Sequence, residues 1–221
     1  MKLVLFDIDG TLIDTGGAGT RSLNKAFYDL LLIENALKGM SLAGKTDMQI
    51  VREGLSFYGI NGGRHKIDKV LDLYVKHLYI EMRNTVKALK PGVLELLDAL
   101  ERSGKMVGLL TGNIEKGANI KLNSLNIAHY FKSGAFGSDN EDRNLLLPIA
   151  VRRFNEIFQI RLNYHDCIVI GDTPRDVDCA KPYGAFSIAA ATGPYTYDEL
   201  LKTDADLVVS DLTDEKVTAL L

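Results

Sequence analysis

The sequence contains little cysteine and therefore offers no disulfide framework. Among its 221 residues there are two, Cys167 and Cys179, and each lies in or next to an apolar run. A chain of this length buries about 70% of its unfolded surface when it folds, so it needs neither disulfides nor a structural metal. We therefore expect two reduced, buried thiols in an ordinary globular protein.

Long apolar segments are also lacking. The longest stretch without a charged residue runs from Pro182 to Tyr197, and it contains two glycines, two prolines and several hydroxyl groups. A membrane-spanning helix needs about 20 mostly apolar residues. At the N-terminus, the apolar run Leu3 to Phe6 is too short for the core of a signal peptide and is ended by Asp7. We expect a cytoplasmic protein that does not enter a membrane.

An excess of positive charge is absent as well. The formal net charge is −3, from 26 Lys and Arg against 29 Asp and Glu. The basic surface typical of nucleic-acid-binding proteins is not expected from this balance. Hydrophobic residues make up 46% of the chain and charged residues 25%, which is the composition of a folded globular protein. No internal repeat or low-complexity segment interrupts it, and the composition leaves the oligomeric state open.

Short apolar runs alternate with helix-length amphipathic segments over most of the chain. The expected strands are 3–6, 105–110, 133–136, 167–170, 185–189 and 207–209, and the expected helices are 93–102, 114–124, 145–158, 175–183 and 214–221. Strands that are separated by helices of about 10–15 residues indicate a parallel sheet with helices on both faces. The predicted fold class is therefore α/β, with a doubly wound, Rossmann-like core.

The alternation stops between Leu12 and Lys90, where the apolar residues instead recur with helical spacing. Gly59 to Gly63 predicts a flexible break between two helices, and Pro91-Gly92 marks the return to the sheet. We predict that residues 1–14 and 89–221 form the α/β core. Residues 15–88 would form an α-helical cap that is inserted after the first strand.

Polar residues, among them acidic ones, follow several of the predicted strands. Asp7-Ile8-Asp9-Gly10-Thr11 follows the first, Thr111-Gly112-Asn113 the second, and Gly171-Asp172-Thr173-Pro174-Arg175-Asp176 the fourth. Ligands bind at the carboxyl ends of the strands in a doubly wound sheet. Carboxylates that are brought together there repel one another unless a cation lies between them. Oxygen ligands at this density favour Mg²⁺.

These segments, in this order, resemble the motifs of the haloacid dehalogenase superfamily in its phosphatase form. The resemblance extends over the whole chain, including the helical insertion, and the C-terminal part is similar to phosphoglycolate-phosphatase-like members. It implies a Mg²⁺-dependent phosphatase that hydrolyses a small phosphorylated metabolite through an aspartyl-phosphate. The implied substrate is phosphoglycolate-like or a sugar phosphate.

The resemblance also implies roles for single residues. Asp7 would be the nucleophile. Asp9 would protonate the leaving oxygen and then activate water, while its carbonyl binds Mg²⁺. Thr111 and the N–H groups of Gly112 and Asn113 would bind the phosphate, although Thr111 is also suited to capping the next helix.

The resemblance also implies which residues hold the metal and which residue supplies positive charge near Asp7. Asp172 would bind the metal directly, and Asp176 would hold a metal-bound water, although Asp176 also suits the start of a helix. The family usually has a lysine in its third motif, where this chain has Arg143. Arg143 supplies a positive charge with a different geometry; alternatively it is a solvated surface residue, and Lys116 would then take its role.

One segment of the predicted cap resembles a loop that reaches the active site in related enzymes. In Leu42-Ala43-Gly44-Lys45-Thr46-Asp47, Gly44, Lys45 and the following N–H groups would favour an anionic or polyhydroxyl leaving group. Alternatively, Thr46 or Asp47 caps a helix and Lys45 is solvated.

Three other functions remain open at this stage. A phosphomutase would use the same core and a cap that closes over a phosphorylated sugar. A dehalogenase is disfavoured because that branch typically lacks the second acid of the first motif, here Asp9. A non-catalytic protein that binds a phosphometabolite is disfavoured because the acids and Thr111 are all present.

Overall fold

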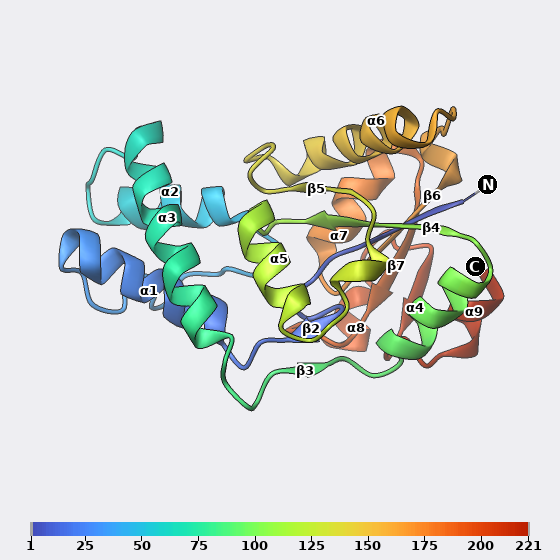
Figure 1. Ribbon diagram of the computed structural model, residues 1–221, viewed down its shortest axis with the longest axis horizontal. Coiled ribbons are helices and arrows are strands. Elements are labelled where there is room, and N and C mark those ends of the chain that lie inside the picture. Colours follow the sequence, from blue (N-terminus) through green and yellow to red (C-terminus); the bar gives the residue numbers. More distant parts are fainter. Residues whose placement is uncertain (1, 221) are drawn as a thin grey trace.

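The computed structural model describes residues 2–220 and has a six-stranded parallel sheet at its centre (Figure 1). The strand order is β5-β4-β1-β6-β7-β8. The strands are β1 (Leu3–Phe6), β4 (Met106–Thr111), β5 (Gly134–Phe136), β6 (Cys167–Gly171), β7 (Phe186–Ala190) and β8 (Leu207–Val209). Such a parallel sheet is stable when both of its faces are covered, and the nearly unbroken apolar character of these strands reflects that burial.

Helices cover both faces of the sheet, as predicted. One face packs against α4 (Val93–Arg102), α5 (Glu115–Asn123) and α9 (Glu215–Leu220). The other face packs against α6 (Leu146–Phe158) and α7 (Pro174–Ala180), and the short α8 (Tyr197–Leu200) lies beside β7. Side chains of β1 alternate between the two layers, because successive residues of a strand point to opposite faces. The doubly wound α/β fold is confirmed.

The pairing register brings the carboxyl ends of the three central strands to one line. Phe6 of β1 lies opposite Leu109 of β4 and Ile170 of β6. The residues that follow these three positions therefore emerge side by side at one edge of the sheet. This edge carries every acidic segment singled out above.

A separate group of helices stands beyond that edge (Figure 1, left). It consists of α1 (Ala18–Leu31), α2 (Asp47–Phe57) and α3 (Arg64–Glu81), which share an apolar core that includes Phe27, Leu55 and Tyr74. The predicted break at 59–63 lies between α2 and α3. Ile114, the N-cap residue of α5, also packs into this core. Because α5 covers one face of the sheet, the cap helices and the sheet domain are in contact.

Two very short strands join the cap helices to the sheet, and the sequence did not predict them. β2 (Ile13–Asp14) pairs in an antiparallel manner with β3 (Ala88–Leu89). A strand of two residues carries no periodic signal, so pairing of this kind depends on the tertiary structure. The predicted boundaries, 14/15 and 88/89, fall on this two-stranded ribbon, and the division into core and cap remains an interpretation.

Most other predicted elements agree within one or two residues. The predicted helix 175–183 is wrong as a single α-helix, because α7 ends at Ala180 and a 3₁₀ turn, Lys181–Tyr183, follows. Pro182 has no N–H with which to continue the α-helix. Another 3₁₀ turn, Arg143–Leu145, precedes α6. Met1 and Leu221, which end the predicted ranges 1–14, 89–221 and 214–221, lie outside the described residues.

Two further expectations concern cysteine and membranes. Cys167 and Cys179 are both free and buried, as predicted. Among residues 2–220, no helix has both the length and the apolar composition needed to cross a membrane.

Candidate active site

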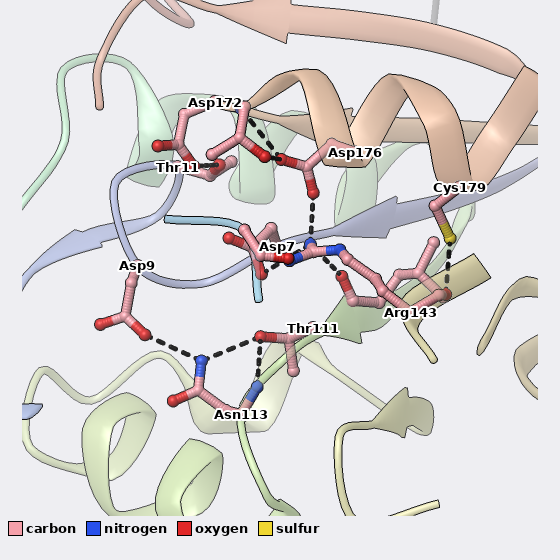
Figure 2. Close-up of polar contacts among 12 residues, drawn as sticks. Asp7, Asp9, Thr11, Thr111, Asn113, Arg143, Asp172, Asp176 and Cys179 are labelled. Atoms are coloured by element: carbon pink, nitrogen blue, oxygen red, sulfur yellow. Dashed lines mark hydrogen bonds and ion pairs between the residues drawn. The ribbon is translucent and has the colours of Figure 1, made fainter. Parts of the chain in front are cut away.

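Asp7 lies at the centre of the polar edge, directly after the central strand β1 (Figure 2). Its N–H donates to the carbonyl of Ile170 on β6, which continues the sheet pairing and fixes the backbone. The residue is only 5% exposed. Burial, opposed by the positive charge of Arg143, raises the pKa of Asp7 from 3.8 to about 6. The side chain is thus a rigidly held carboxylate in a poorly hydrated position.

Two further carboxylates face Asp7, that of Asp172 from the end of β6 and that of Asp176 from the first turn of α7. One oxygen each of Asp7, Asp172 and Asp176 lies within 4.8 Å of the others. Asp172 accepts a hydrogen bond of 2.8 Å from the Thr11 hydroxyl. Burial, together with the charges of Asp176 and Asp7, raises the pKa of Asp172 well above its ordinary value. The cluster is therefore short of positive charge, which suits a bound cation.

Glycine allows the first motif to approach this cluster. Gly10 has φ +85°, and a β-carbon at this position would lie 2.7 Å from the carboxyl carbon of Asp172. Any side chain would be strained by the left-handed backbone and would also collide with Asp172.

Asp176 has a structural role in addition to its place in the cluster. Its carboxylate accepts hydrogen bonds from the Thr173 N–H at 3.0 Å and the Thr173 hydroxyl at 2.7 Å, and it also pairs with Arg143. Thr173 and Asp176 form the capping box of α7. The helix-start role that we considered for Asp176 is therefore observed, and it is compatible with a second role near a metal.

Arg143 is buried, at 4% exposure, so the alternative of a solvated surface arginine is wrong. Its guanidinium lies 3.1 Å from Asp7 and also contacts Asp176. It donates to the carbonyl of Gly44 at 3.0 Å and to that of Leu110 at 3.4 Å. Lys116, the fallback cation, is exposed on α5 and does not line the site. The geometry thus places Arg143, and not Lys116, beside the predicted nucleophile.

Thr111 and Asn113 form the opposite wall. The Thr111 hydroxyl accepts from the Asn113 side-chain amide at 2.9 Å and from the Asn113 N–H at 3.3 Å. The next helix, α5, begins at Glu115 with Ile114 as its N-cap, so the alternative in which Thr111 caps this helix is wrong. Gly112 lies between them, and a β-carbon on it would overlap the carbonyl oxygen of Lys45.

Asp9 turns away from Asp7 and points toward this wall (Figure 2). It accepts from the Asn113 amide at 2.8 Å and pairs with Lys121 at 2.5 Å. Lys121 also donates to the side-chain amide oxygen of Asn113 at 2.5 Å. Its side chain is only 4% exposed. Lys121 was not predicted as a site residue, although the sequence carries a signal for it, because Lys121 interrupts the apolar face that Ala118 and Leu122 form on α5.

The predicted cap loop does reach the site. Thr46 caps α2, accepting from the Gln49 N–H at 3.1 Å, while its hydroxyl donates to the carbonyl of Glu141 at 2.8 Å. The alternative also assumed that Lys45 is solvated, and this part of it is wrong. The Lys45 side chain is 13% exposed and pairs with Glu53 at 2.5 Å.

Asp47 joins the cap to the sheet domain and was not singled out as a site residue. Its N–H donates to the carbonyl of Gly112 at 2.8 Å, and its carboxylate accepts from the Ile114 N–H at 2.8 Å. Ile114 has no side-chain oxygen, so Asp47 caps α5 from another part of the chain. Burial, only partly offset by Lys121, raises the pKa of Asp47 from 3.8 to about 6.

This shift predicts how stability depends on pH. The folded protein binds the Asp47 proton more tightly than the unfolded chain, so the penalty is absent below the unfolded pKa of 3.8 and complete above about 6. Asp47→Asn keeps an acceptor for Ile114 and removes the charge. We expect urea unfolding to show the variant gaining about 3 kcal/mol on the wild type between about pH 4 and pH 8. Asp68→Asn, in an exposed pair with Arg64, is the control; parallel pH profiles for wild type and Asp47→Asn would contradict the expectation.

The residues around Asp7 line an open cavity of about 280 Å³ between the cap and the sheet edge. Its volume is just below the range that is usual for ligand sites, about 300–1,000 Å³, so it suits a small ligand. Its charged lining consists of Asp7, Asp9, Asp47, Asp172, Lys45, Lys121 and Arg143. The remaining lining is a mixture of loop glycines, uncharged polar side chains such as Thr15 and Asn113, Tyr74, and apolar side chains such as Leu23 and Ile50.

Comparison with known proteins agrees with this geometry. A sequence model of the family described as haloacid dehalogenase-like hydrolase matches residues 4–190. The chain belongs to the haloacid dehalogenase-like hydrolase family. The matched span contains every acid of the cluster, both walls of the cavity and all three cap helices.

Curated relatives of this haloacid dehalogenase-like protein include phosphoglycolate phosphatases. The one from Agrobacterium fabrum is 25% identical over 95% of this chain and 88% of its own, and the one from Nitrosospira multiformis is 27% identical over 96% and 92%. These relatives and the family match identify a phosphoric monoester hydrolase. Among solved structures, CbbY from Rhodobacter sphaeroides in complex with phosphate has a TM-score of 0.77 at 18% identity, covering 97% of this chain and 96% of its own. That likeness supports the fold.

Proposed function

We propose that this haloacid dehalogenase-like protein is a Mg²⁺-dependent phosphatase that hydrolyses a small phosphorylated metabolite through an aspartyl-phosphate. The observation that carries the proposal is the position of Asp7. It is buried, with the guanidinium of Arg143 at 3.1 Å and the carboxylates of Asp172 and Asp176 close by. A carboxylate in this setting suits nucleophilic attack on an anionic ester, provided that the negative charges around it are balanced.

The donor set fits Mg²⁺. All three groups of the cluster offer carboxylate oxygens, the ligands that this ion prefers. Asp7, Asp172 and the carbonyl of Asp9 would hold the ion, and Asp176 would hold one of its waters. When bound, the ion supplies positive charge that lowers the repulsion between a carboxylate and a phosphate.

The chain's own groups support two successive steps. In the first, a carboxylate oxygen of Asp7 forms a bond to phosphorus while the bond from phosphorus to the ester oxygen breaks. Asp9 passes a proton to the departing oxygen, and Arg143 balances charge on Asp7. In the second step, Asp9 takes a proton from water, whose oxygen attacks phosphorus and releases Asp7 and inorganic phosphate.

The opposite wall would orient the phosphoryl group. The Thr111 hydroxyl and the N–H groups of Gly112 and Asn113 supply polar contacts next to Asp7. The pair formed by Lys121 and Asn113 holds the Asp9 carboxylate at a fixed place, 2.5 Å and 2.8 Å from its two partners. Preorganised groups of this kind cost no rearrangement when the reaction occurs.

The substrate class rests on the size of the cavity and on the relatives. The cavity volume of about 280 Å³ admits a small ester. The curated relatives are phosphoglycolate phosphatases, and a CbbY variant in complex with xylulose-(1,5)bisphosphate shares the fold with a TM-score of 0.78. Phosphoglycolate-like esters and sugar phosphates are both proposed as candidates.

Metal dependence provides the direct test. We expect phosphate release from p-nitrophenyl phosphate to cease in excess EDTA and to return when Mg²⁺ is added in excess over the chelator. Ca²⁺ should inhibit, because its larger and looser coordination shell disturbs in-line geometry. The assay should include phosphoglycolate and a panel of sugar phosphates. Full activity in excess chelator would contradict the proposed metal, and release of no phosphate from any ester would contradict the proposed function.

A further inference from the structure

The charges at the leaving-group end of the cavity are already matched to one another. The phosphoryl end is fixed by Asp7, so the ester's other half must lie toward Asp9 and the cap loop. Two cations line this end, Lys45 and Lys121. Lys45 lies 2.5 Å from Glu53, and Lys121 lies 2.5 Å from Asp9.

Glu53 is held in place as the partner of Lys45. Its second oxygen accepts from the Gln49 side chain at 2.9 Å, one turn earlier on α2. Burial is outweighed by the bonds from Lys45 and Gln49, which lower the pKa of Glu53, so it stays ionised. Arg175 is near but exposed, and it lines a depression on the outer side of the loop and not the cavity.

A further carboxylate makes the balance more negative. Asp47 lines the same end and bonds to the Ile114 N–H, with no lysine or arginine within ion-pair distance among residues 2–220. Tyr74 lies beside it, and burial together with the charges of Asp47 and Asp9 raises its pKa well above the ordinary value. Its phenol therefore stays protonated and neutral.

We infer that Glu53 determines leaving-group specificity, by neutralising Lys45 so that the site selects uncharged, hydroxyl-bearing leaving groups over carboxylated ones. This inference rests on the proposed phosphatase function. A carboxylate entering this end would meet Asp9 and Asp47, and each lysine would have to give up an existing partner, Glu53 for Lys45 and Asp9 for Lys121. Unmatched buried charge of this kind discriminates strongly between ligands.

Hydroxyl groups meet no such obstacle. A hydroxyl can donate to a carboxylate and accept from a lysine without breaking the pair that they form. The same groups that repel a carboxylate therefore offer several hydrogen-bond partners to a small polyhydroxyl ester, such as a sugar or glycerol phosphate.

A matched pair of substrates tests the inference. 2-Phosphoglycolate and 2-hydroxyethyl phosphate differ in whether a carboxylate or a hydroxymethyl group follows the ester carbon, and p-nitrophenyl phosphate serves as the reference. We expect wild-type kcat/KM to favour the hydroxyl ester by about tenfold or more, the effect of one unmatched charge. Glu53→Gln frees Lys45 without removing it. The variant should shift the ratio of the two kcat/KM values toward phosphoglycolate by about tenfold, because a charge-assisted hydrogen bond becomes available.

Two further variants make the result specific. The double variant Lys45→Gln with Glu53→Gln should return the ratio toward the wild-type value, because the freed cation is then absent. Glu156→Gln, which removes the same charge from an exposed pair with Arg152, should leave the ratio unchanged. Because Glu53 is 37% exposed in its side chain, its replacement should not prevent folding.

The outcomes separate the inference from the proposed function. Hydrolysis of p-nitrophenyl phosphate together with a wild-type preference for phosphoglycolate would overturn the inference and leave the phosphatase intact. An unchanged ratio in Glu53→Gln would overturn it equally. If none of the three esters is hydrolysed in Mg²⁺, the phosphatase proposal fails and the inference fails with it.

Discussion

Asp7→Asn should abolish turnover while the protein remains folded. The amide cannot form the aspartyl-phosphate, so we expect kcat to fall by about 10⁴-fold or more, as for loss of a nucleophile in other enzymes. Stability should be maintained in Mg²⁺-free buffer at neutral pH. Burial has raised the Asp7 pKa to about 6, so the amide relieves an unfavourable buried charge there. Phosphate release and urea unfolding measure the two effects.

The covalent step can be observed directly in the same pair of proteins. Acid-quenched wild type should carry a phosphoryl group that mass spectrometry places on Asp7, and Asp7→Asn should carry none. Asp178→Asn is a suitable control, because Asp178 lies exposed on α7, two residues after Asp176. Near-normal phosphatase activity in Asp7→Asn would show that the mechanism is wrong.

The convergence of the acids could be predicted because it depends on the sheet alone. Short apolar runs separated by helices indicated parallel strands, and parallel strands present their carboxyl ends at one edge. The register then requires Asp7, Thr111 and Asp172 to be neighbours, since Phe6 lies opposite both Leu109 and Ile170.

The site residues that were not predicted from the sequence lie instead where the cap helices pack against the sheet domain. Asp47 bonds to Ile114, which is 67 residues away in the sequence, and no local pattern announces a helix cap supplied from that distance. Lys121 was less hidden. A single charged position in the apolar face of α5 indicates a buried partner, but the sequence does not identify Asp9 as that partner.

Lys45 shows a different limit. The loop was predicted to reach the site and does line the cavity, and Lys45 was interpreted as a cation available to an anionic or polyhydroxyl leaving group. Its pairing with Glu53 depends on the path of the chain between Gly44 and the first turn of α2, with Thr46 as the N-cap. The residue types could therefore locate the loop, but they could not show that Lys45 is already paired with a carboxylate.

Arg143→Ala should lower both stability and activity by large amounts. The alanine leaves Asp7 and Asp176 buried without their cation, and removal of one partner from a buried pair typically costs about 3–5 kcal/mol in the free energy of unfolding. Loss of one preorganised charge contact should cost on the order of 3 kcal/mol in transition-state stabilisation, or ~10²-fold in kcat. Urea unfolding and steady-state kinetics measure the two losses separately.

Arg143→Lys distinguishes the charge from the shape of the guanidinium. Arg143 contacts two carboxylates and also donates to the carbonyls of Gly44 and Leu110, at 3.0 Å and 3.4 Å. An ammonium group restores positive charge near Asp7 but has only three donors on one atom, so it cannot serve four acceptors spread around a planar fork. We expect Arg143→Lys to keep more activity than the alanine variant but less than the wild type. Its KM should rise, because the bond to the Gly44 carbonyl ties the cap loop to the site. Lys116→Ala is the matched control on the exposed side of α5 and should behave as the wild type. An active Arg143→Ala together with an inactive Lys116→Ala would instead assign the cation of the third motif to Lys116.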